Sequence, residues 1–65
     1  MDINFWNDAG HLIAEVKSDA VPRVGELIDV DNQHLVVHKV KWVVAAEQME
    51  VDVTVGLPAH GASSK

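Results

Sequence analysis

The chain has 65 residues, 48% of them hydrophobic, with ten acidic and five basic side chains and a net charge of −5. This length supports one small domain, and the lack of cysteine excludes disulfides and thiolate metal sites as sources of stability. Stability must therefore come from burial or from association between copies. No apolar run is long enough to span a membrane and the first residues do not resemble a signal peptide, so we expect a cytoplasmic protein without a membrane partner.

The amino-terminal residues predict two short strands. Residues 3–6 and 11–17 combine β-branched, aromatic and alternating polar side chains. The connecting sequence NDAG predicts a turn, because Asn7 suits the first turn position and Gly10 the last. We therefore expect an antiparallel hairpin at the start of the chain.

A third strand is expected at residues 26–31, after a loop that contains Pro22 and Gly25. A three-residue loop at residues 32–34 would connect it to the next strand. A two-residue loop would turn its apolar side chains toward the lysines of that strand, so the hydrophobic pattern favours the longer loop. The expected pairs are Val30 with Val36 and Ile28 with His38.

The clearest strands are residues 34–44 and 49–57, where side chains alternate in character. A hairpin across residues 45–48 places their apolar positions on one face and sets Lys41 opposite Asp52. This register puts Trp42 in the core. The expected pairs are Val44 with Met49, Trp42 with Val51, Val40 with Val53 and His38 with Val55.

These elements predict an all-β fold. Five short antiparallel strands in residues 1–57 would form a small SH3-like or OB-like barrel, because an open sheet would leave exposed edges and an uncovered apolar face. Residues 58–65, PAHGASSK, have no apolar periodicity and predict a flexible tail.

One segment, PRVGELIDVDNQHLVVHKVKWV, resembles the start of small phage and bacterial SH3-like proteins. In those proteins a Pro-x-x-Gly loop enters a strand that is followed by a strand of the V-x-x-V-x-W type. The resemblance covers about a third of the chain and implies a barrel, but it implies no activity. The matching positions are Pro22, Gly25, Val37, Val40 and Trp42.

Two histidines four residues apart, His34 and His38, raise the possibility of a metal site. On a helix they could share an ion, as in zinc metalloproteases. On a strand, four steps separate their Cα atoms by roughly 13 Å, which is too far for one ion. His11 and His60 lack a conventional ligand spacing, so we expect no metal and no cofactor.

The sequence also gives little support for catalysis or nucleic-acid binding. Its serines are in loops and have no flanking nucleophile motif, and paired carboxylates on strands are typical of solvated sheet faces. A barrel this small has no room for a substrate, so we expect neither an enzyme nor a small-molecule substrate. The net negative charge disfavours nucleic acid, for which only Trp6 is a plausible exposed stacking residue.

The outer face of residues 34–44 is the predicted interface, since it mixes apolar and charged side chains. A strongly bent barrel that buries part of this face is an equally weighted alternative. We therefore expect a non-enzymatic interaction or assembly module, self-associating or binding a protein partner. An acidic phage-type inhibitor or nucleic-acid mimic is the second hypothesis, and a nucleic-acid-binding barrel is the third. The predicted interface residues are Trp6, Leu27, Leu35, Val37, Lys39, Lys41 and Val43.

Overall fold

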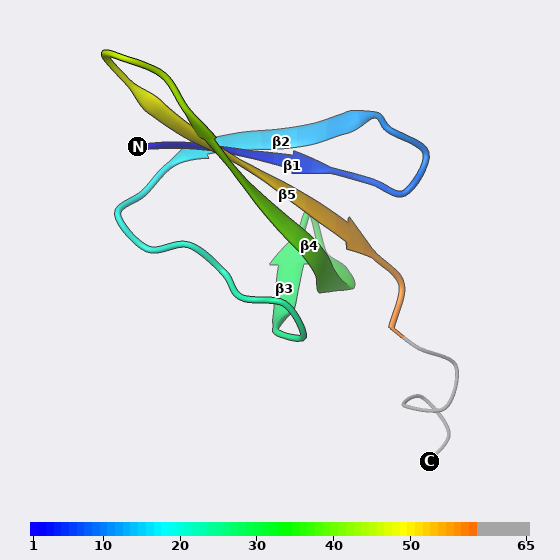
Figure 1. The fold of residues 1–65 in the computed structure, drawn as a ribbon. Coiled ribbons are helices and arrows are strands. Elements are labelled where there is room, and N and C mark those ends of the chain that lie inside the picture. Colours follow the sequence, from blue (N-terminus) through cyan, green and yellow to red (C-terminus); the bar gives the residue numbers. More distant parts are fainter. Residues whose placement is uncertain (59–65) are drawn as a thin grey trace.

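A computed structural model of the chain describes residues 1–58, which form a five-stranded, all-β sheet (Figure 1). Each strand lies where the sequence predicts one. The predicted tail, apart from its first residue, lies outside the described residues. No helix in the described part of the chain is long and apolar enough to cross a membrane. The strands are β1 (Asp2–Trp6), β2 (Leu12–Lys17), β3 (Leu27–Val30), β4 (Gln33–Val44) and β5 (Met49–Gly56).

The sheet is mixed, and the prediction of a purely antiparallel fold is wrong. The strand order is β2-β1-β5-β4-β3, and β1 pairs with β5 in parallel while the other three pairs are antiparallel. Each connection reverses the chain direction, so the first and fifth strands run the same way. They can be neighbours only as a parallel pair.

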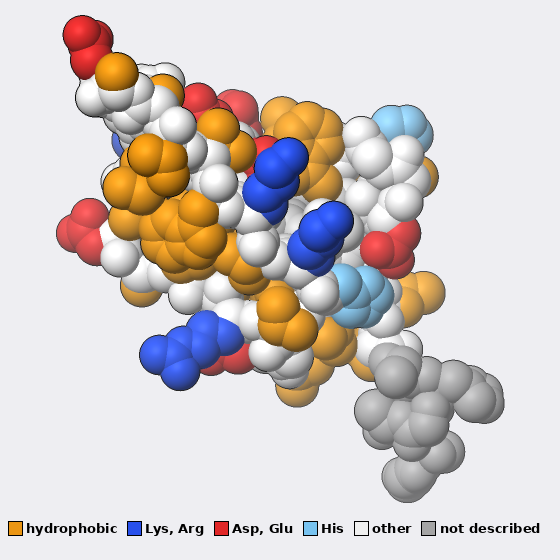
Figure 2. All heavy atoms as spheres, in the orientation of Figure 1, with side chains coloured by type: hydrophobic (Ala, Val, Ile, Leu, Met, Phe, Trp, Pro, Cys, Tyr) orange, Lys and Arg blue, Asp and Glu red, His pale blue; other side chains and the backbone are white. Residues whose placement is uncertain are grey.

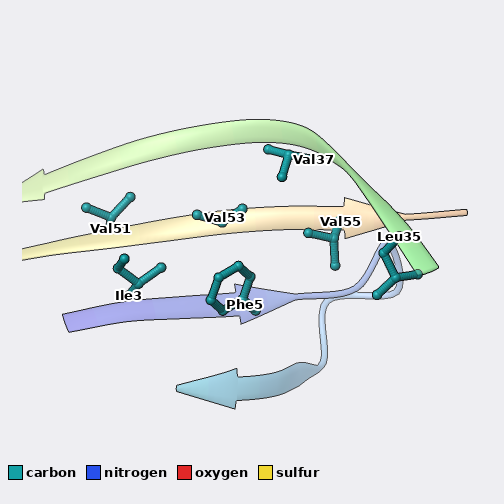
Figure 3. Packing of buried hydrophobic residues seen from close by; sticks show 7 residues of the cluster. All are labelled: Ile3, Phe5, Leu35, Val37, Val51, Val53 and Val55. Atoms are coloured by element: carbon teal, nitrogen blue, oxygen red, sulfur yellow. The ribbon is translucent and has the colours of Figure 1, made fainter. Parts of the chain in front are cut away.

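The sheet curls into a half-barrel whose two edges, β2 and β3, do not pair with each other. Its concave face carries the core, which consists of side chains from β1, β4 and β5 (Figure 3). Residues 18–26 cross from one edge to the other, and Gly25 and Glu26 there form backbone hydrogen bonds with Val37. Gly25 has a φ of 94°, which other residues rarely adopt. The buried core residues are Ile3, Phe5, Leu35, Val37, Val51, Val53 and Val55.

A β-bulge at His38 interrupts the β4–β5 ladder. From Val44 to Val40 the predicted register is confirmed, including Lys41 opposite Asp52. The predicted pairing of His38 with Val55 is wrong, because Val55 pairs with Val37 and His38 is an extra residue. One inserted residue changes which positions face the core. Inward positions are therefore odd-numbered before His38 and even-numbered after Lys39.

The β3–β4 connection is a two-residue turn and not the predicted three-residue loop. Asp31 and Asn32 have φ values of 51° and 68°, and Ile28 pairs with Leu35. Positive φ at both central residues is the signature of the type I′ hairpin turn. The alternation pattern of residues 34–44 disfavours the shorter loop because, without a bulge, that loop directs Ile28 toward the lysines. The bulge removes that conflict, since Leu35 faces the core.

Candidate protein interface

Two of the predicted interface residues, Leu35 and Val37, are not on the surface. Both are buried in the core, and Val37 has 0% of its surface exposed. Their assignment to the outer face assumed unbroken alternation along residues 34–44. The bulge breaks that alternation, so the bent strand hides these two side chains. A partner cannot contact them without unfolding the sheet.

The other predicted residues are on the convex surface, where they do not form a continuous apolar patch. Lys39, Lys41 and Val43 are exposed on the outer side of β4. Trp6 is partly buried and shares a cross-strand row with Lys39, because both pair with Thr54. Leu27 is 72% exposed on β3, on the far side of the bulge.

Hydrogen bonds on the convex face tie Trp6 to acidic side chains. Asn4 Nδ2 donates to Glu50 Oε1 and to Asp52 Oδ1, each at 3.1 Å. Trp6 Nε1 donates to the same Asp52 oxygen at 3.2 Å. This network fixes the indole against the sheet. It also occupies Asp52, which has no ion pair with Lys41 among the described residues despite their pairing across the strands.

The two histidines of β4 contact different carboxylates at separate places. His34 forms an ion-pair contact with Asp29 of β3. His38 Nδ1 lies 3.4 Å from Asp8 Oδ1, in the β1–β2 turn. Both histidines lie on one extended strand, as predicted. Among residues 1–58, no three histidine or acidic side chains gather as metal ligands would.

The largest exposed apolar side chains on the inner face lie next to the turn of the β4–β5 hairpin. Trp42 is 50% exposed and Val44 is 74% exposed, and Met49 beside them is also exposed. The prediction that Trp42 belongs to the core is correct for its register but wrong for its burial. We call the three residues Trp42, Val44 and Met49 the hairpin patch.

The hairpin patch is exposed because neighbouring strands end before they reach it. On one side, β3 pairs with β4 only from Gln33 to Val36, so Trp42 and Val44 lie on a free edge. The row through Trp42 continues to Val51 and Ile3, but the row of Val44 and Met49 lies beyond the first residue of β1. Figure 1 shows the hairpin tip projecting past β1 and β2. Hydrophobic side chains gather over this hairpin in Figure 2, next to basic side chains. The sequence predicts the β4–β5 register from Val40 to Val44 but contains no signal for how far β1 extends along β5.

Comparisons with known proteins find no matching family model, no matching curated protein and no matching solved structure. The surfaces described above are therefore the basis for proposing a function.

Proposed function

We propose that this protein is a non-enzymatic interaction or assembly module and that the hairpin patch is its contact surface for a protein partner. The observation that carries this proposal is the half-exposed indole of Trp42 beside two other exposed apolar side chains, Val44 and Met49. Tryptophan is enriched among the residues that contribute most to binding energy at protein interfaces. Contiguous exposed apolar residues on a small domain mark contact sites more often than single ones do.

The surroundings of the hairpin patch also fit a protein interface. The charged residues next to it in the chain, Lys41 and Glu50, direct their side chains to the convex face, so the patch itself is apolar, as the centre of a protein interface usually is. The described residues bury no polar or charged side chain. Catalysis normally relies on titratable groups held in a cleft, so this composition supports a binding role over an enzymatic one.

The proposed contact surface differs from the one that the sequence predicts. Lys39, Lys41 and Val43 remain accessible on the convex side of β4, but the apolar residues that would have accompanied them are buried. On the concave side, Trp42 and Val44 supply apolar area on the same strand. The proposal therefore keeps β4 as the binding strand and moves the contact to its other face.

A capture experiment with matched variants tests this function. The chain is immobilised, and proteins retained from a bacterial lysate are identified and then purified for direct binding measurements. Trp42→Ser should weaken binding of the purified partner at least about tenfold, because it removes a central apolar contact. Leu27→Ser is the control, since Leu27 is also highly exposed but lies away from the hairpin patch. Equal effects of the two substitutions, or no effect of Trp42→Ser, would contradict the proposal.

An acidic inhibitor or nucleic-acid mimic is the second candidate, and one observation favours it. Three acidic side chains, Asp2, Glu15 and Glu50, line a shallow hollow around Asn4 together with one basic side chain, Lys17. Such a surface would attract a basic protein. Salt separates the two candidates, because charge-driven capture weakens steeply between low and high ionic strength, whereas apolar capture persists.

We also propose a kinship with small SH3-like barrels. Support comes from the curled five-stranded sheet and from the loop that contains Pro22 and Gly25. The parallel β1–β5 pair departs from an all-antiparallel barrel. Nuclear Overhauser contacts between β2 and β3 in solution would strengthen the kinship, and contacts confined to the pairs β2–β1 and β3–β4 would weaken it.

A further inference from the structure

The free edge of β2 exposes backbone groups that point away from the sheet. Ser18 N donates to Met1 O at 3.0 Å, and the Met1 amino group donates back to Ser18 O at 3.3 Å. Bonded and non-bonded pairs alternate along an antiparallel ladder, so Val16, two residues earlier, also directs its backbone groups toward β1. Glu15 and Lys17 then direct their N–H and C=O groups outward. A further strand can form ladder hydrogen bonds with these two residues, and not with Val16 between them.

We propose that the β2 edge pairs antiparallel with β2 of a second copy of this chain, with Val16 on the twofold axis. In this register the bonded pairs join Glu15 to the partner's Lys17 and Lys17 to the partner's Glu15. The twofold axis makes each contact occur twice. Opposite charges directly across two strands stabilise their pairing. The edge is therefore complementary to itself in charge as well as in hydrogen bonding.

The two registers shifted by one residue would place like charges opposite each other. An axis through Glu15 would set this carboxylate opposite its own copy, and an axis through Lys17 would set the two ammonium groups together. In the remaining registers the twofold axis would pass midway between two residues. Each residue with outward backbone groups would then face a residue whose backbone groups point toward its own β1, so no ladder could form. Among the registers centred on Glu15, Val16 or Lys17 of β2, only the one centred on Val16 satisfies both the backbone and the charges.

Pairing at this edge also covers an exposed apolar side chain. Val16 is 45% exposed and faces the concave side beside Ile3. On the twofold axis it would meet the partner's Val16 in a non-bonded pair, in which side chains approach closely. The apolar row of Val16, Ile3 and Val51 would then continue into the second copy. A chain with a small core and no cysteine gains stability from such an association.

This dimer goes beyond the proposed function, because it uses β2 and leaves the hairpin patch free. A cysteine placed on the axis tests the register directly, since the chain has no cysteine of its own. Val16→Cys should form a disulfide-linked dimer under mild oxidation, because the non-bonded pair matches disulfide geometry. Leu12→Cys is the matched control. Leu12 is 45% exposed on the same strand, as is Val16, but its two copies would lie roughly 26 Å apart.

We expect Val16→Cys to cross-link at least about tenfold faster than Leu12→Cys, as the two separations require. Equal rates would show that any dimer forms by random collision or in another register. Absence of a Val16→Cys dimer at millimolar concentration would also overturn the inference.

Charge exchange provides an independent test by sedimentation equilibrium, with twice the 7.1 kDa chain mass expected for the dimer. Glu15→Lys and Lys17→Glu should each raise the dissociation constant about tenfold, because each places like charges opposite one another twice. The variant that carries both changes should return to within about threefold of the original chain, since opposite charges face again. Circular dichroism confirms that each variant folds.

Failure of the double exchange to restore association would contradict this register. Trp42→Ser should leave the dimer unchanged. A dimer that is lost with Trp42→Ser but insensitive to the charge exchanges would place self-association on the hairpin patch, which would overturn the β2 pairing while leaving the proposed function intact.

Discussion

The two ends of β4 contain the same residue type on the same face of the sheet and differ completely in burial. Val37 has 0% of its surface exposed, and Val44 has 74% exposed. Both lie on a strand of twelve residues, and both direct their side chains to the concave side. Residue type and strand propensity therefore do not explain which valine belongs to the core.

The difference lies in what crosses the concave face at each end. Near Val37, β4 bends at the bulge (Figure 3), and Gly25 and Glu26 form backbone hydrogen bonds with it while β3 pairs with the preceding residues of β4. Near Val44, only β5 lies beside β4, because β1 begins one row later. The end of β4 near Val37 is thus part of the core, and we call it the closed end. The end near Val44 is an accessible surface, and we call it the open end.

The largest effect on stability is expected from deleting Val36, because the deletion changes which side chains face the core at the closed end. Without this residue, Leu35 and Val37 become adjacent, and adjacent strand residues face opposite sides. One of two core side chains must then turn outward. We expect a loss of more than about 3 kcal/mol in the free energy of unfolding, measured by urea titration.

Deleting His38, two positions later, is the control for that prediction. This deletion removes the extra residue of the bulge, so Lys39 and Val37 become regular neighbours opposite Thr54 and Val55. The core residues keep their facing, and only the bend and the contact with Asp8 are lost. The chain should still fold, with a loss of about 1–2 kcal/mol. Equal destabilisation by the two deletions would refute the role given to the bulge.

A pair of identical substitutions compares the two ends directly. Val37→Ala should lower the free energy of unfolding by about 2–3 kcal/mol, because it removes two buried methyl groups and leaves a cavity. Val44→Ala should change the free energy by less than about 0.5 kcal/mol, since its methyl groups are already in contact with water. Chemical denaturation followed by circular dichroism measures both. A large loss from Val44→Ala would mean that the hairpin end is covered, for example by another copy.

The sequence predicts the strands well because local side-chain patterns determine them. Regular alternation from Met49 to Leu57 and β-branched density from His34 to Val44 identify β4 and β5 and most of their register. Alternation cannot reveal the bulge, because both faces of residues 34–44 contain apolar side chains. The wrong loop length between β3 and β4 is a direct consequence of that missed residue.

The candidate interface is less predictable than the strands. Its position depends on the parallel pairing of β1 with β5, which joins residues about fifty positions apart in sequence. No local pattern encodes where β1 begins relative to Met49. Val44 and Met49 could be assigned to the inner face from the sequence, but their exposure depends on this long-range register. The same pairing leaves β2 as a free edge, which places Glu15, Val16 and Lys17 at the proposed dimer contact.

The smallest effects on the free energy of unfolding are expected at the two turns on either side of β4, and the two effects should have opposite signs. Asn32 has a φ of 68° in the two-residue turn at the closed end. Glycine adopts this conformation without strain, so Asn32→Gly should raise the free energy of unfolding by about 0.5 kcal/mol. At the open end, the turn is closed by a hydrogen bond of 3.0 Å from Ala45 N to Gln48 O, and Ala46 within it has no positive φ.

Ala46→Gly should therefore lower the free energy of unfolding by about 0.5 kcal/mol, because glycine gives the unfolded chain more freedom and the native turn does not need it. Thermal unfolding of the two variants side by side measures the sign of each change. Two changes of the same sign would mean that the closed end does not depend on the left-handed turn, and the Ile28–Leu35 register derived from that turn would need revision.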